Sequence, residues 1–145
     1  MSLDGTYDDA NIFAKILRGE APATRVYEND DVLAFMDVFP QSRGHVLVIP
    51  KRSRARNLLE AEPEVVAPLF AGVQRLVRAM RTALKPDGVM VSQFNGAASG
   101  QTVYHLHIHV IPRWDGVPLG RHANGGMADP EELKALAAQI AAEIS

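Results

Sequence analysis

Histidines and apolar residues alternate along residues 104–110 of this chain. Because side chains alternate across a β-strand, an extended conformation puts the histidines on one face and the apolar residues on the other. The first face carries His105, His107 and His109, and the second carries Tyr104, Leu106, Ile108 and Val110. The pattern predicts a strand over residues 103–111 that is anchored in the core by its apolar face and ended by Pro112.

The rest of the chain carries patterns typical of helices and further strands. Apolar residues at helical spacing predict a helix over residues 11–18, a long one over about 63–84 and a last one opening at 129–132. Apolar and β-branched runs between turn residues predict strands over 25–28, 32–37, 45–49 and 89–94. Residues 113–128 are irregular and Gly-rich, and we expect a mobile tail or a flap there. Because the helices do not alternate strictly with the antiparallel strands, the predicted fold class is α+β.

Composition narrows the function classes. A chain of 145 residues fits one domain, here a core over about 11–113 and a tail with the last helix over 114–145. A formal net charge of -2 argues against a protein that binds bulk nucleic acid by neutralising phosphates. The absence of cysteine excludes disulfides, a thiol nucleophile and cysteine-ligated zinc. The sequence has no signal-peptide pattern at its start and no apolar run near the ~18 residues of a membrane span, so we expect a cytoplasmic protein without a membrane partner.

Three interpretations of the histidine face compete. A solvated or internally hydrogen-bonded face does not explain three imidazoles at every second position of one strand. They fit a metal site, since imidazole is the commonest nitrogen ligand of zinc. They fit nucleophilic catalysis equally well, because crowded imidazoles resist protonation and a neutral ring can attack phosphorus. The triplet alone favours neither metal binding nor catalysis over the other.

The residues before the triplet favour catalysis. Gly96 and Gly100 permit a tight loop whose amides can point at an anion, and Gln101 and Thr102 add side-chain donors. No Asp or Glu stands close to the triplet as a further metal ligand or as a partner of a ligand. The segment is therefore more typical of a phosphate site than of a metal cage.

Residues 105–111 resemble the His-φ-His-φ-His-φ-φ signature of the histidine triad (HIT) family. The resemblance to its Hint-like branch runs in order through residues 12–20, 26–28, 33–37, 44–51 and 100–105, and covers about 11–113. It implies a five-stranded antiparallel sheet and a homodimer formed through the long helix and a strand. It also implies a purine nucleotide pocket and release of a nucleoside monophosphate from a phosphoramidate, a mixed anhydride or a dinucleotide.

The resemblance also implies roles for single residues. His107 corresponds to the nucleophile, His105 to the residue whose backbone carbonyl orients it, and His109 to a phosphate contact. His45 corresponds to a fourth histidine beside the triad, and Thr102 to a hydroxyl that helps to protonate the leaving group. The implied nucleotide contacts are Asp37 at the ribose, Phe13 and Val38 at the base, and Asn95, Gly100, Gln101 and His109 near the phosphate.

This sequence departs from the family pattern in three places. Phe94 occupies the position where the family often has an amide residue. Whether Asn95 or Gln93 supplies that amide instead is left open. Without cysteine the chain lacks the N-terminal zinc site of some bacterial relatives, and we expect no metal and no cofactor. The tail after Arg113, which includes His122, matches poorly. The alternatives to a nucleotide hydrolase or transferase are a histidine-ligated metalloprotein and a non-catalytic nucleotide-binding dimer.

Overall fold

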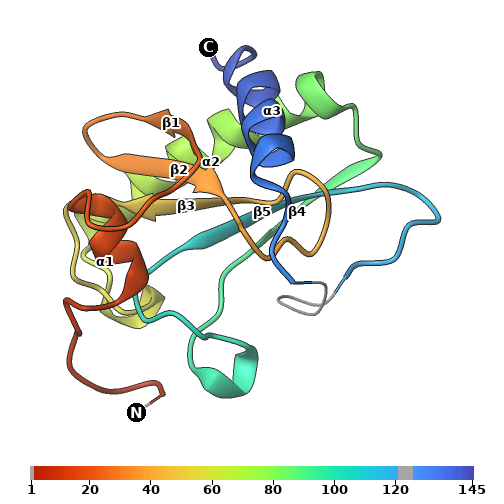
Figure 1. Ribbon diagram of the computed structural model, residues 1–145. Coiled ribbons are helices and arrows are strands. Elements are labelled where there is room, and N and C mark those ends of the chain that lie inside the picture. The colour runs from red at the N-terminus through yellow and green to blue at the C-terminus, as the bar shows by residue number, and fades with distance from the viewer. Residues whose placement is uncertain (1, 121–125) are drawn as a thin grey trace.

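The computed structural model describes residues 2–120 and 126–145 (Figure 1). In this part of the chain five antiparallel strands form one sheet in the order β1-β2-β3-β5-β4. The strands are β1 (Arg25–Glu28), β2 (Val32–Met36), β3 (Val46–Pro50), β4 (Gly88–Ser92) and β5 (Ile108–Arg113). The helices are α1 (Ile12–Leu17), α2 (Pro63–Leu84) and α3 (Pro130–Ala141), with short 3-10 helices at η1 (Leu58–Glu60) and η2 (Ala97–Ser99). The predicted α+β class and five-stranded antiparallel sheet are confirmed.

The two faces of the sheet carry separate apolar clusters. Even-numbered residues of the central strands, such as Ala34, Val48 and Val110, pack with α2 and α3, which lie together on one face (Figure 1). Odd-numbered residues such as Phe35 and Leu47 pack on the other face, with side chains of α1. Because side chains alternate along a strand, the odd-numbered residues at the strand ends also belong to the α1 face. Those residues are Asp37, His45 and His109.

The helices follow their sequence signals closely. Pro63 occupies the first turn of α2, where its missing N–H costs nothing, and Lys85 ends the helix in a left-handed conformation. In α3 the Asp129 side chain accepts a hydrogen bond from the Glu131 N–H, as the predicted cap requires. Among the described residues, none of these helices is long and apolar enough to cross a membrane.

The predicted strand over residues 103–111 is wrong at both ends. β5 begins only at Ile108, because the preceding segment runs along residues 51–57 instead, where the Leu106 N–H donates to the Ala55 carbonyl at 2.9 Å. β5 also continues through Pro112 to Arg113. This proline is tolerated because β3 pairs with β5 only as far as Val110, so the β3 side of Pro112 needs no backbone donor.

The chain after β5 returns to the loop between β2 and β3. Residues 114–120 and 126–129 form no helix or strand. The Gly120 N–H donates to the Gln41 carbonyl at 2.8 Å, and the Ala128 N–H donates to the Val38 carbonyl at 2.9 Å. Two points of the predicted tail, Gly120 and Ala128, are thus tied to one loop. His122 lies outside the described residues.

Candidate active site

Four histidines gather on the α1 face of the sheet. His109 belongs to β5, His107 and His105 lie in the segment before it, and His45 follows Gly44 directly before β3. All four are buried, with side chains no more than 8% exposed. The ring centroid of His109 lies 5.1 Å from that of His107 and 5.1 Å from that of His45. The predicted gathering of imidazoles opposite an apolar face is confirmed, although only His109 lies in the strand.

The proton of His107 is placed by its neighbour's backbone. Its Nδ1 lies 2.7 Å from the carbonyl oxygen of His105, and a carbonyl oxygen can only accept a hydrogen bond. Nδ1 therefore carries the proton. In the neutral ring the lone pair is then on Nε2, which is the arrangement a nucleophilic imidazole needs.

The ring of His105 is held from both sides. Its Nε2 donates to the Pro50 carbonyl oxygen at 3.2 Å, so its Nδ1 accepts from the Tyr7 hydroxyl at 2.7 Å. Burial lowers the pKa of His105 from 6.5 to about 4, and the bond to the Pro50 carbonyl opposes this only in part. His105 is therefore uncharged near neutral pH. Sequence reasoning missed Tyr7, whose one signal is a single aromatic residue within the acidic, polar first segment.

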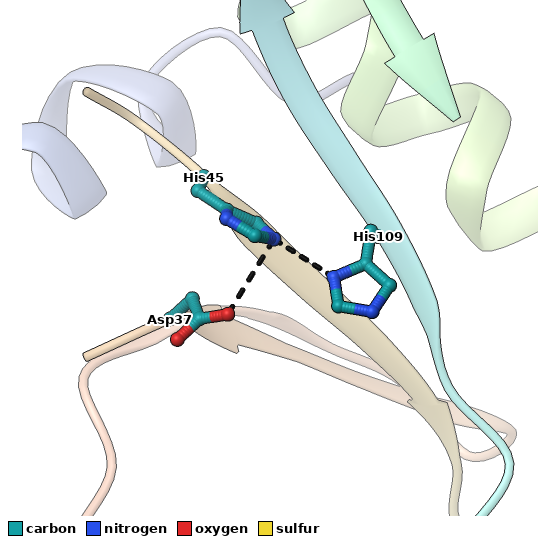
Figure 2. A group of neighbouring side chains, drawn as sticks. All are labelled: Asp37, His45 and His109. Carbon is teal, nitrogen blue, oxygen red and sulfur yellow. Dashed lines mark hydrogen bonds and ion pairs between the residues drawn. The ribbon is translucent and has the colours of Figure 1, made fainter. Parts of the chain in front are cut away.

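Asp37, His45 and His109 form a hydrogen-bonded group at the other end of the cluster (Figure 2). The Gln41 N–H donates to His45 Nδ1 at 3.1 Å, so the proton of a neutral His45 is on Nε2. This Nε2–H donates to His109 Nδ1 at 2.9 Å and lies 3.5 Å from Asp37 Oδ2. A neutral His109 consequently carries its own proton on Nε2.

The geometry bears on the metal hypothesis. Backbone or tyrosine groups already bond both ring nitrogens of His105 and one of His107. The three triad histidines are therefore not arranged as three ligands of one ion. Asp37, His45 and His109 each offer an atom within 4.8 Å of the others, which is close enough for a cation. However, His45 would have to bind the cation through Nε2 while its Nδ1 accepts a backbone N–H. Because ligating histidines normally donate a hydrogen bond from their second nitrogen, this arrangement disfavours a metal at His45.

Phe13 forms an apolar wall beside the cluster. It is 7% exposed, and its ring centroid lies 4.9 Å from that of His107 and 5.4 Å from that of Phe35. Val38, the second predicted base contact, is partly buried and packs with the α2 and α3 side of the core. Val38 follows Asp37 directly, so the alternation that sends Asp37 to the α1 face sends Val38 to the opposite one. Phe13 and Val38 therefore lie on opposite faces of the sheet.

The glycine loop differs from the predicted anion cradle. The N–H groups of Ser99 and Gln101 donate to the Gly96 carbonyl, and that of Gly100 donates to the Ala97 carbonyl, so these amides close η2. The Gln101 amide is saturated by four partners, Arg56 O, Val103 O, Asn57 Nδ2 and the Gly96 N–H. Gln101 and Gly100 thus shape the loop in this structure. Of the two predicted side-chain donors, Gln101 is buried and Thr102 is exposed.

The two amide side chains at residues 93–95 bond each other. Asn95 and Gln93 bond each other through both amide groups, and Asn95 Oδ1 also accepts from the Leu58 N–H at 2.9 Å. Both side chains are therefore engaged away from the triad. Phe94 instead faces His109, with ring centroids 5.2 Å apart. An apolar ring consequently borders the predicted phosphate contact at this position.

An open antiparallel sheet with one helix pair behind it and a buried histidine cluster in front defines a narrow class of α+β proteins. The HIT domain profile matches residues 18–116, and the chain belongs to the HIT domain family. A Hit-like protein from Bartonella henselae superimposes with a TM-score of 0.90 at 48% identity, over 97% of this chain and 100% of that one.

Two curated relatives match over most of their length. Protein hit of Bacillus subtilis is 36% identical over 92% of this chain and 94% of its own. The adenosine 5'-monophosphoramidase hnt1 of Schizosaccharomyces pombe is 34% identical over 92% of this chain and 97% of its own.

Proposed function

We propose that this protein is a nucleotide hydrolase or transferase that forms a covalent nucleotidyl intermediate on His107. One observation carries the proposal: the His105 carbonyl fixes the proton of His107 on Nδ1 at 2.7 Å and so directs the lone pair to Nε2. The relative in Schizosaccharomyces pombe that is named a phosphoramidase supports the reaction class.

The reaction runs in two displacements. His107 Nε2 attacks phosphorus, the new N–P bond forms, and the bond from phosphorus to the leaving group breaks. The leaving amine or oxyanion takes a proton. We assign its donation to the hydroxyl of Thr102, which is exposed and precedes the triad in sequence. Water or another acceptor then attacks the phosphohistidine and the N–P bond breaks. The proton of the attacking group restores the donor that protonated the leaving group, a nucleoside 5'-monophosphate or its conjugate leaves, and neutral His107 returns.

The other residues bind and orient the substrate. His109 carries its proton on Nε2 when neutral, because its Nδ1 accepts from His45, and we assign that Nε2–H to a phosphate oxygen. Asp37 is assigned to the ribose hydroxyls, and Phe13 to one face of a purine base. Phosphoramidates, mixed anhydrides and dinucleoside polyphosphates share the phosphorus centre that this set of residues would take.

We also propose that the protein acts as a homodimer through α2 and β4. β4 is an edge strand, and its Val91 side chain is 42% exposed. An apolar residue on the open edge of a sheet is a place where a second chain can add. A cytoplasmic location, and partners limited to nucleotides without nucleic acid or membrane, stay predictions from composition.

The nucleophile is tested with adenosine phosphoramidate and the variant His107→Asn. We expect turnover to fall on the order of a thousandfold or more, because an amide cannot form the covalent intermediate. AMP affinity, measured by calorimetry, should change less than about tenfold, since binding uses the neighbouring groups. Full turnover in His107→Asn contradicts the assignment. A wild-type protein that binds AMP and shows no turnover supports the non-catalytic alternative.

A further inference from the structure

Tyr7 touches the triad from a segment that precedes α1. Its hydroxyl lies 2.7 Å from His105 Nδ1, and the two rings meet edge to face with centroids 5.8 Å apart. Tyr7 is half-buried and lies outside residues 18–116, which match the family profile. The resemblance on which the other site roles rest says nothing of this contact.

The direction of the hydrogen bond follows from the opposite side of the ring. His105 Nε2 faces the Pro50 carbonyl oxygen, which can only accept, so Nε2 carries the proton of the neutral ring. Nδ1 is then an acceptor and Tyr7 is the donor. The imidazole is held between one donor and one acceptor, which fixes both its tautomer and its rotation.

The fixed ring belongs to the residue whose carbonyl orients His107. The His105 carbonyl oxygen accepts from His107 Nδ1 at 2.7 Å, two residues along the chain. A rotation of the His105 side chain therefore has a direct route to the peptide that holds the His107 tautomer. Phe13 lies against both rings, with centroids 6.4 Å from His105 and 4.9 Å from His107.

Tyr7 is itself held in place by a charged pair. The Arg54 guanidinium carbon lies 4.8 Å above the centre of the Tyr7 ring, and Arg54 pairs with both carboxylate oxygens of Asp9. This contact combines cation–π attraction with a bidentate ion pair. These contacts join the segment before α1 to residues 51–57. The segment that contains His105 lies along the same residues.

We propose that Tyr7 is a positioning residue for His107 that acts through the ring and carbonyl of His105. The inference rests on the proposed function, in which His107 is the nucleophile. The contacts of Tyr7 with the triad are a hydrogen bond and an edge-to-face ring contact to His105. We therefore expect Tyr7 to affect the orientation of the attacking nitrogen rather than substrate affinity.

The test compares Tyr7→Phe with the matched control Tyr27→Phe. The control also removes one tyrosine hydroxyl with a single hydrogen bond, to Asn29 in the β1–β2 turn. With adenosine phosphoramidate we expect Tyr7→Phe to lower kcat about tenfold to a hundredfold, as loss of orientation does, and to change KM less than about twofold. Tyr27→Phe should leave both constants near wild type. Equal kcat values for Tyr7→Phe and the control overturn the proposal.

Ring nitrogen NMR supplies a second measurement that needs no turnover. In the wild type the His105 signals should show an unprotonated Nδ1 and a protonated Nε2, and those of His107 a protonated Nδ1. In Tyr7→Phe the His105 Nδ1 signal should move because it loses its hydrogen-bond donor, and the His107 Nδ1 signal should move because its hydrogen bond to the His105 carbonyl changes in length. Tyr27→Phe should move neither signal. Unmoved His107 signals in Tyr7→Phe overturn the positioning role. If the wild type does not turn over the substrate, the proposed function fails separately, and the NMR result still decides whether Tyr7 positions the His105 and His107 rings.

Discussion

Carbonyl oxygens fix the protons of the first two triad histidines. The Pro50 carbonyl takes the Nε2–H of His105, and the His105 carbonyl takes the Nδ1–H of His107. Because a carbonyl oxygen cannot donate, these contacts choose the tautomers without any charged partner. The lone pair of His107 Nε2 is thus set by backbone geometry, and its direction depends on how the segment before β5 is held.

Burial of His105 makes stability depend on pH in acid. The pKa of His105 falls from 6.5 to about 4 on folding, so between these values the unfolded chain binds more protons. Stability is therefore fully present above pH 6.5 and is lost as the pH falls toward 4, by up to about 3 kcal/mol for this group. Urea unfolding at pH 7, 5.5 and 4 measures the slope. The slope should be shallower in His105→Gln, and equal slopes in the two proteins contradict the contribution of this ring.

At the level of elements, Gly44 lets the chain enter β3 beside the site. Its φ is +95°, and an added Cβ would lie 2.5 Å from Leu84 Cδ1 and 3.2 Å from Pro112 Cγ. An added methyl group would therefore require the Leu84 side chain of α2 to move and would press on the Pro112 ring of β5. His45 is the next residue, so any shift here moves the group that donates to His109.

We expect Gly44→Ala to lower the free energy of unfolding by about 3 kcal/mol through left-handed strain plus overpacking, and to lower turnover as well. Gly19→Ala is the matched control, since Gly19 has φ +78° with no atom within 4 Å of its added Cβ. The control should cost only about 1 kcal/mol and leave turnover unchanged. Equal losses of stability in thermal or urea unfolding contradict the packing argument.

The elements were predictable where a periodic pattern coincides with packing. The long apolar repeat and Pro63 predicted α2 closely, and Asp129 predicted the start of α3. The start of β5 was not predictable, because residues 103–107 alternate in the same way while lying against another loop. The loop amides were also misjudged, since Gly96 and Gly100 serve a 3-10 turn as readily as an anion site.

Within the site, the histidine cluster was predictable and its partners were not. Alternation alone brought the triad to one side, and the resemblance added His45 and Asp37. The contact between Tyr7 and His105 spans 98 residues, and no local pattern encodes such a pairing. The saturated amide of Gln101 likewise depends on Arg56 and Asn57, which are distant in sequence.

At the scale of the whole molecule, the edge strand leads to a prediction about assembly. Light scattering after size exclusion should give twice the mass of one chain. Val91→Lys should shift the protein toward the monomer, because an ammonium group placed in an apolar interface lacks a partner there. Leu59→Lys changes a side chain that is 67% exposed on η1 and should leave the dimer intact. A monomeric wild type contradicts the proposed assembly.

For the whole molecule, we propose above all that His107 Nε2 becomes bonded to phosphorus during turnover. Rapid acid or base quenching of the protein with adenosine phosphoramidate, followed by mass spectrometry of its peptides, tests this most directly. We predict an adenylyl group on His107 that appears within one turnover and is absent in His107→Asn. Turnover without an adduct on His107, or an adduct on another residue that persists in His107→Asn, contradicts it.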